Sequence, residues 1–158
     1  MSANEQLISK FYQAFQNKDF KTMQNCYDDK AVFNDEVFKN LDARQVRMMW
    51  EMLIKRGRDL NIEFKNINTN EKEGSVQWEA TYTFTQTKRK VTNEIKASFK
   101  FENDRIIQHT DHFNFYKWSR QAFGVAGFFL GWTPMFKGKV RQEAMKDLHK
   151  YIGENHNN

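Results

Sequence analysis

The sequence predicts an α+β fold in which N-terminal helices cover one face of a curved antiparallel sheet, with an additional C-terminal helix. Apolar residues recur at helical spacing up to residue 57 and then at every second position from residue 60 to 116. The alternating runs are joined by short connections, which favour an antiparallel meander. With 158 residues and no linker or internal repeat, the chain is expected to form one domain, residues 1–158.

The first helix is expected to begin at a capping box formed by Ser2 and Glu5, because a serine three residues before a glutamate satisfies free backbone N–H groups. Its apolar residues then recur at helical spacing as far as Phe15. A short second helix, ending at a turn of residues 28–30, would carry Phe20, Met23 and Tyr27.

A brief extended segment over residues 31–35 leads to the clearest helix of the chain. Asp42 and Gln45 repeat the capping signal, and Gly57 is a natural helix stop. Between them runs an apolar stripe that consists of Val46, Met49, Trp50, Leu53 and Ile54.

Four alternating runs follow, over residues 60–64, 76–84, 91–101 and 105–116. Alternation at period two is typical of strands with one buried face. The apolar face is rich in aromatic residues, so the helices must cover it. Asn93 is the one polar residue on that face of the third run.

The last run contains the leading candidates for chemistry, His109 and Asp111, on the same face as Ile107, Phe113 and Phe115. Two ionisable groups on an apolar wall are candidates for acid/base catalysis, because burial shifts proton affinity and each charge needs a partner. The alternative is that the two side chains satisfy each other and tie the sheet to a helix.

Further polar candidates lie on other elements. Asp35 is either a second acid/base or the cap of the turn at residues 34–36. Tyr82 and Asn93 point inward and could orient a polar group of a ligand or bond a neighbouring backbone group. The apolar walls of a ligand cavity, or simply the core, would be formed by Trp50, Trp78, Phe99 and Phe113.

No metal site is expected, because His109 and His112 point to opposite faces of a strand. His149 and His156 are isolated near the C-terminus. Cys26 is the single cysteine, which excludes an intramolecular disulfide and fits a reducing, cytoplasmic location. The longest apolar run, residues 122–132, is far shorter than the roughly 20 residues of a membrane span.

The net charge of +5 gathers toward the C-terminus, where residues 117–150 carry seven Lys or Arg against two Asp or Glu. A second basic cluster, residues 88–90, lies between two predicted strands. No nucleic-acid-binding motif accompanies these charges, so a solvated basic face is expected and not a nucleic-acid partner.

The C-terminal segment contains a glycine-spaced apolar stretch over residues 123–136. It is expected either to close the cavity as a lid or to form a dimer contact. A last helix follows, with apolar positions Val140, Ala144, Leu148 and Ile152.

Several segments resemble the NTF2-like superfamily, in particular its SnoaL-like and ketosteroid-isomerase-like branches. They run from Phe11-Tyr12 through Tyr27-Asp28-Asp29 and the segment 31–35 to the strand 105–111. The resemblance covers residues 4–116 and leaves 117–153 as the lid or dimer extension. It implies a cone-shaped pocket for a small hydrophobic molecule, no cofactor and a homodimer.

Individual family residues carry over unevenly. The proton-transferring aspartate of the isomerase branch falls at Asp35, but its two oxyanion donors fall at Phe11 and Ala97. Loss of one such donor typically costs a factor of about a hundred in rate, so steroid isomerisation is not expected. Limonene epoxide hydrolase uses an Asp-Arg-Asp set, but the inner strand faces of this chain offer no arginine for it. The acid/base aspartate of SnoaL-like cyclases corresponds to Asp111.

Three functions therefore stay open. The first is an enzyme that isomerises, cyclises, dehydrates or hydrolyses a small hydrophobic molecule through Asp111 and His109, with Asp35 assisting. The second is a ligand-binding module without turnover. The third is an interaction domain that uses the outer face of the sheet.

Overall fold

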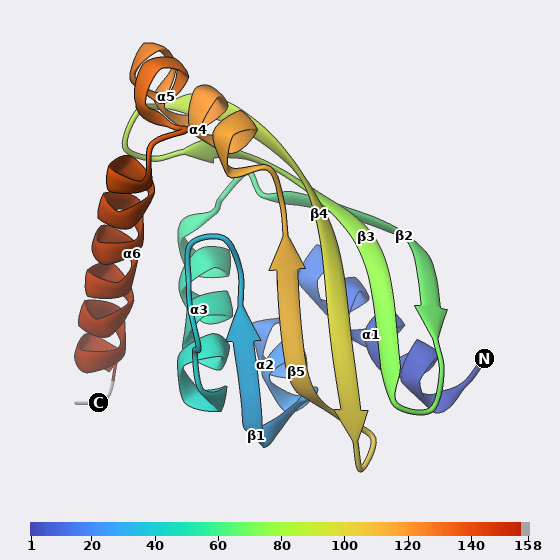
Figure 1. Ribbon diagram of the computed structural model, residues 1–158. Coiled ribbons are helices and arrows are strands. Elements are labelled where there is room, and N and C mark those ends of the chain that lie inside the picture. Colours follow the sequence, from blue (N-terminus) through green and yellow to red (C-terminus); the bar gives the residue numbers. More distant parts are fainter. Residues whose placement is uncertain (156–158) are drawn as a thin grey trace.

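The computed structural model describes residues 1–155, with helices and strands arranged as in Figure 1. In chain order they are α1 (Ala3–Gln16), α2 (Phe20–Asn25), β1 (Tyr27–Asn34), α3 (Ala43–Arg56), β2 (Asn61–Thr69), β3 (Glu73–Phe84), β4 (Arg89–Glu102), β5 (Arg105–His112), α4 (Phe115–Phe123), α5 (Val125–Leu130) and α6 (Pro134–Asn155). His156 lies outside the described residues.

Five strands form one curved sheet in the order β1-β5-β4-β3-β2. The meander of β2 to β5 is antiparallel, as the short connections predicted. β1 joins the edge of the sheet parallel to β5, which the sequence pattern did not indicate. Since β1 and β5 run in the same direction, residues that follow their last pairs lie at the same end of the sheet.

Two predicted helix starts and one predicted helix end are confirmed by their caps. The Ser2 hydroxyl accepts a hydrogen bond from the Glu5 N–H at 3.1 Å. Asp42 and Gln45 form the complete capping box of α3, and Gly57 is its C-cap. These local signals were reliable because each depends on residues within one turn of the chain.

Two predicted boundaries are wrong. Tyr27 does not end the second helix but begins β1, and residues 28–30 lie in that strand, where its register against β5 shifts. β5 ends at His112 and not at residue 116, because the Asn114 side chain caps α4 by accepting from the Lys117 N–H. Phe115 therefore lies on a helix.

A register shift also changes the face assignment at the start of β5. Ile106 is fully buried, whereas Ile107, predicted on the face of His109, is half-buried. The shift lies where β4 passes from Lys100 to Phe101. From His109 onward the alternation is as predicted.

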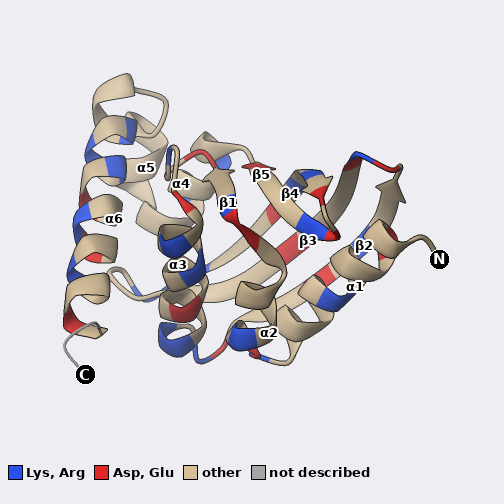
Figure 2. Cartoon of the chain, turned by 90° about the horizontal axis from the view of Figure 1, so that it is seen from below, with Lys and Arg blue, Asp and Glu red and all other residues tan. Residues whose placement is uncertain are grey.

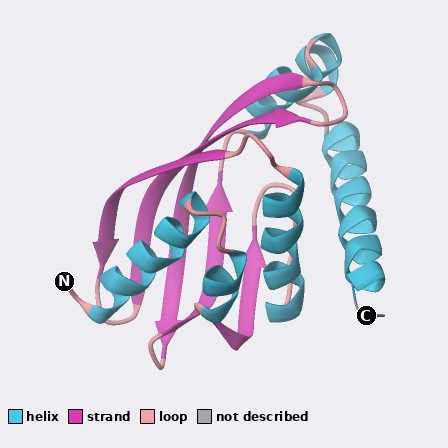
Figure 3. Cartoon of the chain, turned by 180° about the vertical axis from the view of Figure 1, so that it is seen from behind, coloured by secondary structure: helices cyan, strands magenta, loops and turns pink. Residues whose placement is uncertain are grey.

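Helices α1, α2 and α3 lie on one side of the sheet, and Figure 3 shows them from that side. Their apolar faces meet the inner face of β3, β4 and β5 in one core. A smaller cluster under α4 contains Val91, Phe115, Trp118 and Ala122.

The C-terminal helices extend this body. α6 stands beside α3, as Figures 1 and 3 agree, and is joined to it by an Arg56–Asp147 ion pair at 2.6 Å and a Tyr151–Glu51 hydrogen bond at 3.0 Å. α4 and α5 lie at the far end of β3 and β4 (Figure 1). Among residues 1–155, no helix combines the length and apolarity needed to cross a membrane.

Candidate functional site

A partly open cavity of about 1100 Å³ lies between the inner face of the sheet, α3 and the C-terminal helices. Seven residues singled out from the sequence line it: Asp35, Trp50, Trp78, Tyr82, Asn93, Phe113 and Asp111. The C-terminal segment contributes Phe123, Leu130, Thr133, Met135 and Phe136 to its rim. The cone and its extension therefore enclose one space.

Asp111 places a carboxylate in the deep part of this cavity. It lies on β5 opposite Ala97 and is only 3% exposed. Its Oδ1 accepts hydrogen bonds from His109 Nε2 at 2.9 Å and from Trp78 Nε1 at 3.3 Å. Because both donors bind Oδ1, the second oxygen is the one left for a ligand.

His109 stands behind Asp111 and does not line the cavity. It is 0% exposed and is surrounded by aromatic rings, with the Phe99 centroid at 4.3 Å and that of Phe33 at 5.0 Å. Phe99, predicted as a cavity wall, therefore packs against His109 instead of lining the cavity.

A chain of hydrogen bonds fixes the imidazole. Trp50 Nε1, which can only donate, bonds the Tyr27 hydroxyl at 2.9 Å, and that hydroxyl lies 2.7 Å from His109 Nδ1. In the arrangement that gives the hydroxyl proton a partner, this proton points to Nδ1 and the ring proton lies on Nε2, directed at Asp111.

Asp35 lies beside Asp111 at the same end of the sheet. Asn34, the last residue of β1, pairs with Thr110, so each aspartate is one residue further along parallel strands. The Oδ1 atom of Asp35 accepts from the N–H groups of Val37 at 2.7 Å and Phe38 at 2.5 Å. Asp35 thus caps its turn and also lines the cavity.

The environment of Asp35 changes its protonation. The pKa of this carboxyl is raised from 3.8 to about 7, first by burial and to a smaller extent by the charge of Asp111, against the opposing effect of the two backbone N–H groups. Near neutral pH Asp35 is therefore a carboxyl that exchanges its proton readily beside Asp111.

The remaining predicted side chains support this site or lie away from it. The Tyr82 hydroxyl accepts from Trp118 Nε1 at 2.8 Å at the cavity wall. Asn93 is buried on the inner face of β4. His112 points outward, 3.8 Å from Glu36, and residues 1–155 contain no cluster of three or more His, Cys, Asp or Glu able to hold a metal.

The sequence reasoning missed Tyr27 and Trp118. Tyr27 was assigned to a helix because the irregular register of β1 hides its place on the face of Phe33. Trp118 lies in the extension, where no strand pattern reaches. The Tyr12 hydroxyl is a further buried group, without a hydrogen-bond partner among the described residues, and its pKa is raised first by burial and then by the charge of Asp111.

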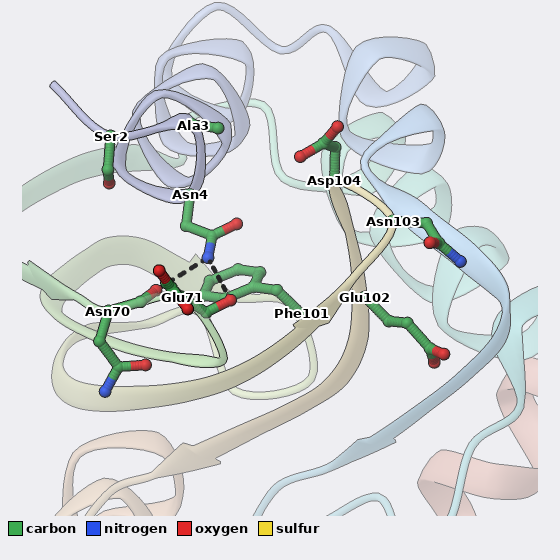
Figure 4. A pocket seen from close by; sticks show the side chains of 9 residues that line it. All are labelled: Ser2, Ala3, Asn4, Asn70, Glu71, Phe101, Glu102, Asn103 and Asp104. Carbon is green, nitrogen blue, oxygen red and sulfur yellow. Dashed lines mark hydrogen bonds between the residues drawn. The ribbon is translucent and has the colours of Figure 1, made fainter.

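A second hollow of about 430 Å³ lies where the start of α1 meets the β2–β3 and β4–β5 turns (Figure 4). Asn4 Nδ2 bonds the carbonyl oxygens of Asn70 at 2.8 Å and Glu71 at 3.1 Å, so its amide joins the helix to the turn. Its role there is structural.

Comparison with known proteins agrees with this architecture. The model of the SnoaL-like domain family matches residues 8–109, so the chain belongs to that family. The match ends at His109, which leaves Asp111 and the C-terminal helices beyond it. A comparison with curated proteins gave no match.

Solved structures show the same fold at low sequence identity. An NTF2-like protein of unknown function from Burkholderia pseudomallei is 16% identical with a TM-score of 0.68, covering 77% of this chain and 98% of that one. IdmH, a putative polyketide cyclase from Streptomyces antibioticus, is 16% identical with a TM-score of 0.64, covering 77% and 99%. An LEH-like epoxide hydrolase from M. tuberculosis is 18% identical with a TM-score of 0.62, covering 77% and 90%. The predicted α+β, NTF2-like cone is thus confirmed.

Proposed function

We propose that this protein is an enzyme that moves protons on a small hydrophobic organic molecule bound in the cavity, with Asp111 as base and Asp35 as acid. The observation that carries the proposal is that the carboxyl groups of Asp111 and Asp35 line one cavity at neighbouring positions of parallel strands, where burial raises the pKa of Asp35 to about 7. Pairs of titratable groups whose environments push their pKa values apart are typical of acid/base sites.

The roles follow from the surroundings of each group. Asp111 is positioned by hydrogen bonds from His109 and Trp78 to Oδ1, so Oδ2 can take a proton from a substrate carbon or hydroxyl. Asp35, with a pKa of about 7, can give its proton to a substrate oxygen that gains charge. In an isomerisation, Asp111 then gives its proton to another substrate carbon and Asp35 takes its own proton back from the substrate oxygen. In a cyclisation the protonated substrate oxygen stays as a hydroxyl, and in a dehydration it leaves as water. In both of these reactions the proton on Asp111 then passes to Asp35, which restores both groups.

Epoxide hydrolysis by an Asp-Arg-Asp set is less well supported. The cavity rim does include Arg56, but its guanidinium bonds Asp147 at 2.6 Å. It is therefore committed to joining α3 to α6. A proton exchange between two carboxyls needs no arginine.

A binding module without turnover is the second candidate. It is favoured by the full commitment of Asp111 Oδ1 and both ring nitrogens of His109 to partners in the protein. In that case the pair stabilises the sheet, and the apolar cavity only holds a ligand. A homodimer in the cytoplasm also stays part of the proposal, which sedimentation and cell fractionation would test.

A panel assay separates the two candidates. Purified protein is incubated in D₂O with hydrophobic cyclic ketones, β-hydroxyketones and epoxides, and NMR records deuterium exchange or conversion. Binding is followed by quenching of the tryptophans that line the cavity, Trp50, Trp78 and Trp118. Native mass spectrometry of freshly purified protein identifies a bound molecule to extend the panel.

Asp111→Asn keeps the side-chain shape but removes the base, so we expect turnover to fall by about 10²- to 10⁴-fold while ligand affinity stays within a few-fold. Asp104→Asn, the same change at an exposed turn, is the matched control. Tight binding of a panel compound that wild-type protein never converts would favour the binding module.

A further inference from the structure

An exposed apolar projection lies at the end of the molecule beside the cavity. We name residues 125–135 the α5 tip; Trp132 is 71% and Met135 85% exposed. Its exposed large apolar side chains are Val125, Phe128, Phe129, Leu130, Trp132 and Met135. Elsewhere in the described chain only Met1, Val32 and Leu53 are large, apolar and exposed. Such a gathering of exposed apolar side chains within 11 residues indicates an interaction surface.

The packing of α5 on α4 directs these side chains outward. A Cβ atom on Gly127 would lie 1.9 Å from the Ser119 carbonyl oxygen, so the small face of α5 must rest on α4. The Tyr116 hydroxyl adds a bond to the Phe128 carbonyl at 3.0 Å. The larger side chains are therefore left on the opposite face by construction.

The charged residues that flank the α5 tip in the sequence are all basic. No Asp or Glu occurs from residue 113 to 142, while Lys117, Arg120 and Lys139 lie on either side of the tip. Arg120 also stacks over the Phe128 ring at 5.7 Å. Lys and Arg bands recur along α6 in Figure 2.

The second basic cluster, residues 88–90, is brought next to α4 and the α5 tip by the fold. Arg89, the first residue of β4, donates from Nε to the Gln121 carbonyl of α4 at 2.8 Å. Its neighbours Lys88 and Lys90 are exposed. Two basic segments that are separate in the sequence thus flank one apolar tip.

We propose that the α5 tip binds the headgroup layer of membranes that contain anionic lipid. Aromatic and aliphatic side chains enter the boundary between headgroups and acyl chains, and flanking Lys and Arg bind anionic headgroups. A second copy of this chain fits less well, because a two-fold contact would oppose the same basic residues without acidic partners from this segment.

The position of the tip links the membrane to the cavity. Leu130, Thr133 and Met135 belong to the tip and also line the cavity. When the protein is bound to a membrane through the tip, the opening of its cavity would therefore lie at the bilayer surface, where small hydrophobic compounds concentrate. Membrane binding by the tip does not depend on whether the protein converts a substrate in the cavity.

The test uses flotation of the full chain with vesicles of phosphatidylcholine alone or with about one-third phosphatidylserine. We expect wild-type protein to float with the anionic vesicles at low salt and to be released at high salt. The double variant Phe128→Ser/Phe129→Ser is expected to lose more than tenfold in affinity. Lys88→Ala and Lys90→Ala are each expected to lose roughly fivefold.

Matched controls lie elsewhere on the surface. Val32→Ser removes an exposed apolar side chain from β1, and Lys65→Ala removes an exposed charge from β2; neither should change flotation. Phe128 and Phe129 do not line the cavity, so their variants should keep wild-type turnover without vesicles. Failure of this proposal is thus separate from failure of the proposed enzyme.

Four outcomes would overturn the membrane proposal. One is a wild-type protein that floats with neither vesicle. Another is a loss no greater in the Phe128/Phe129 variant than in the controls. A third is a wild-type dimer in sedimentation that this variant makes monomeric while no form floats. The fourth is a protein that binds a single-stranded RNA probe and neither vesicle.

Discussion

The two aspartates of the cavity lie side by side and are held in different ways. Asp111 receives side-chain hydrogen bonds from His109 and Trp78, and the first of these is backed by Tyr27 and Trp50. Asp35 receives only backbone N–H groups within its own turn. Burial and, to a smaller extent, the charge of Asp111 raise the pKa of Asp35 to about 7, although two backbone N–H groups oppose this shift.

This difference indicates that the two regions have different roles. The hydrogen-bonded network around Asp111 on β5 lies inside the protein and holds its groups in place, whereas Asp35, in the β1–α3 turn, can release its proton. The variants below break one side of the comparison while leaving the other intact.

Among the variants of this comparison, the largest effect is expected for Asp35→Asn. The amide oxygen can still accept from Val37 and Phe38, so the turn survives, but the acid is lost, and turnover should fall by about 10²-fold or more. In wild-type protein kcat/KM should decrease above pH 7, as Asp35 loses its proton. A variant that kept this decrease would show that another group causes it; Asp42→Asn, a cap on the same connection, is the control.

Folding stability should respond to the same proton. The folded pKa of Asp35 lies above its unfolded value, so the folded state binds the proton more tightly, and the stabilisation is full below pH 4 and lost as pH rises toward 7. From this group the free energy of unfolding should fall by up to about 1.4 kcal/mol per pH unit in that window. Denaturant titrations at pH 4 to 8 should show this slope in wild-type protein and its absence in Asp35→Asn.

A smaller effect is expected for Tyr27→Phe, on the Asp111 side. The variant leaves His109 Nδ1 and Trp50 Nε1 without their partner, which should cost about 1–3 kcal/mol of stability. It should also lower kcat more than it changes KM, because the imidazole loses the bond that fixes its tautomer. Tyr116→Phe removes a surface hydroxyl bond to Phe128 and should cost far less. Equal costs for the two variants would contradict a supporting role for the buried chain.

Much of this fold could be predicted from local sequence patterns. The caps at Ser2 and Asp42 and the alternation of β4 were readable because each depends on neighbours within the chain. The parallel pairing of β1 with β5 was not, because it joins segments about 80 residues apart and a register shift masks the strand pattern at Tyr27.

The candidate site was predicted in part for the same reason. The period-two alternation places His109 and Asp111 on one face, but it does not predict that the His109 imidazole packs behind the Asp111 carboxylate, away from the cavity. That order depends on Phe33, Phe99 and Tyr27, which come from three other positions in the fold. The catalytic and ligand-binding roles of these residues stay predictions for the assays above.

The most direct measurement is a titration of the Asp35 side-chain carboxyl by ¹³C NMR in wild-type protein and in Asp111→Asn. The account predicts a pKa near 7 in wild-type protein and a lower value in the variant, since the neighbouring charge is gone. A pKa near 4 in both proteins, or one near 7 that Asp111→Asn leaves unchanged, would contradict the coupled pair on which the proposed function rests.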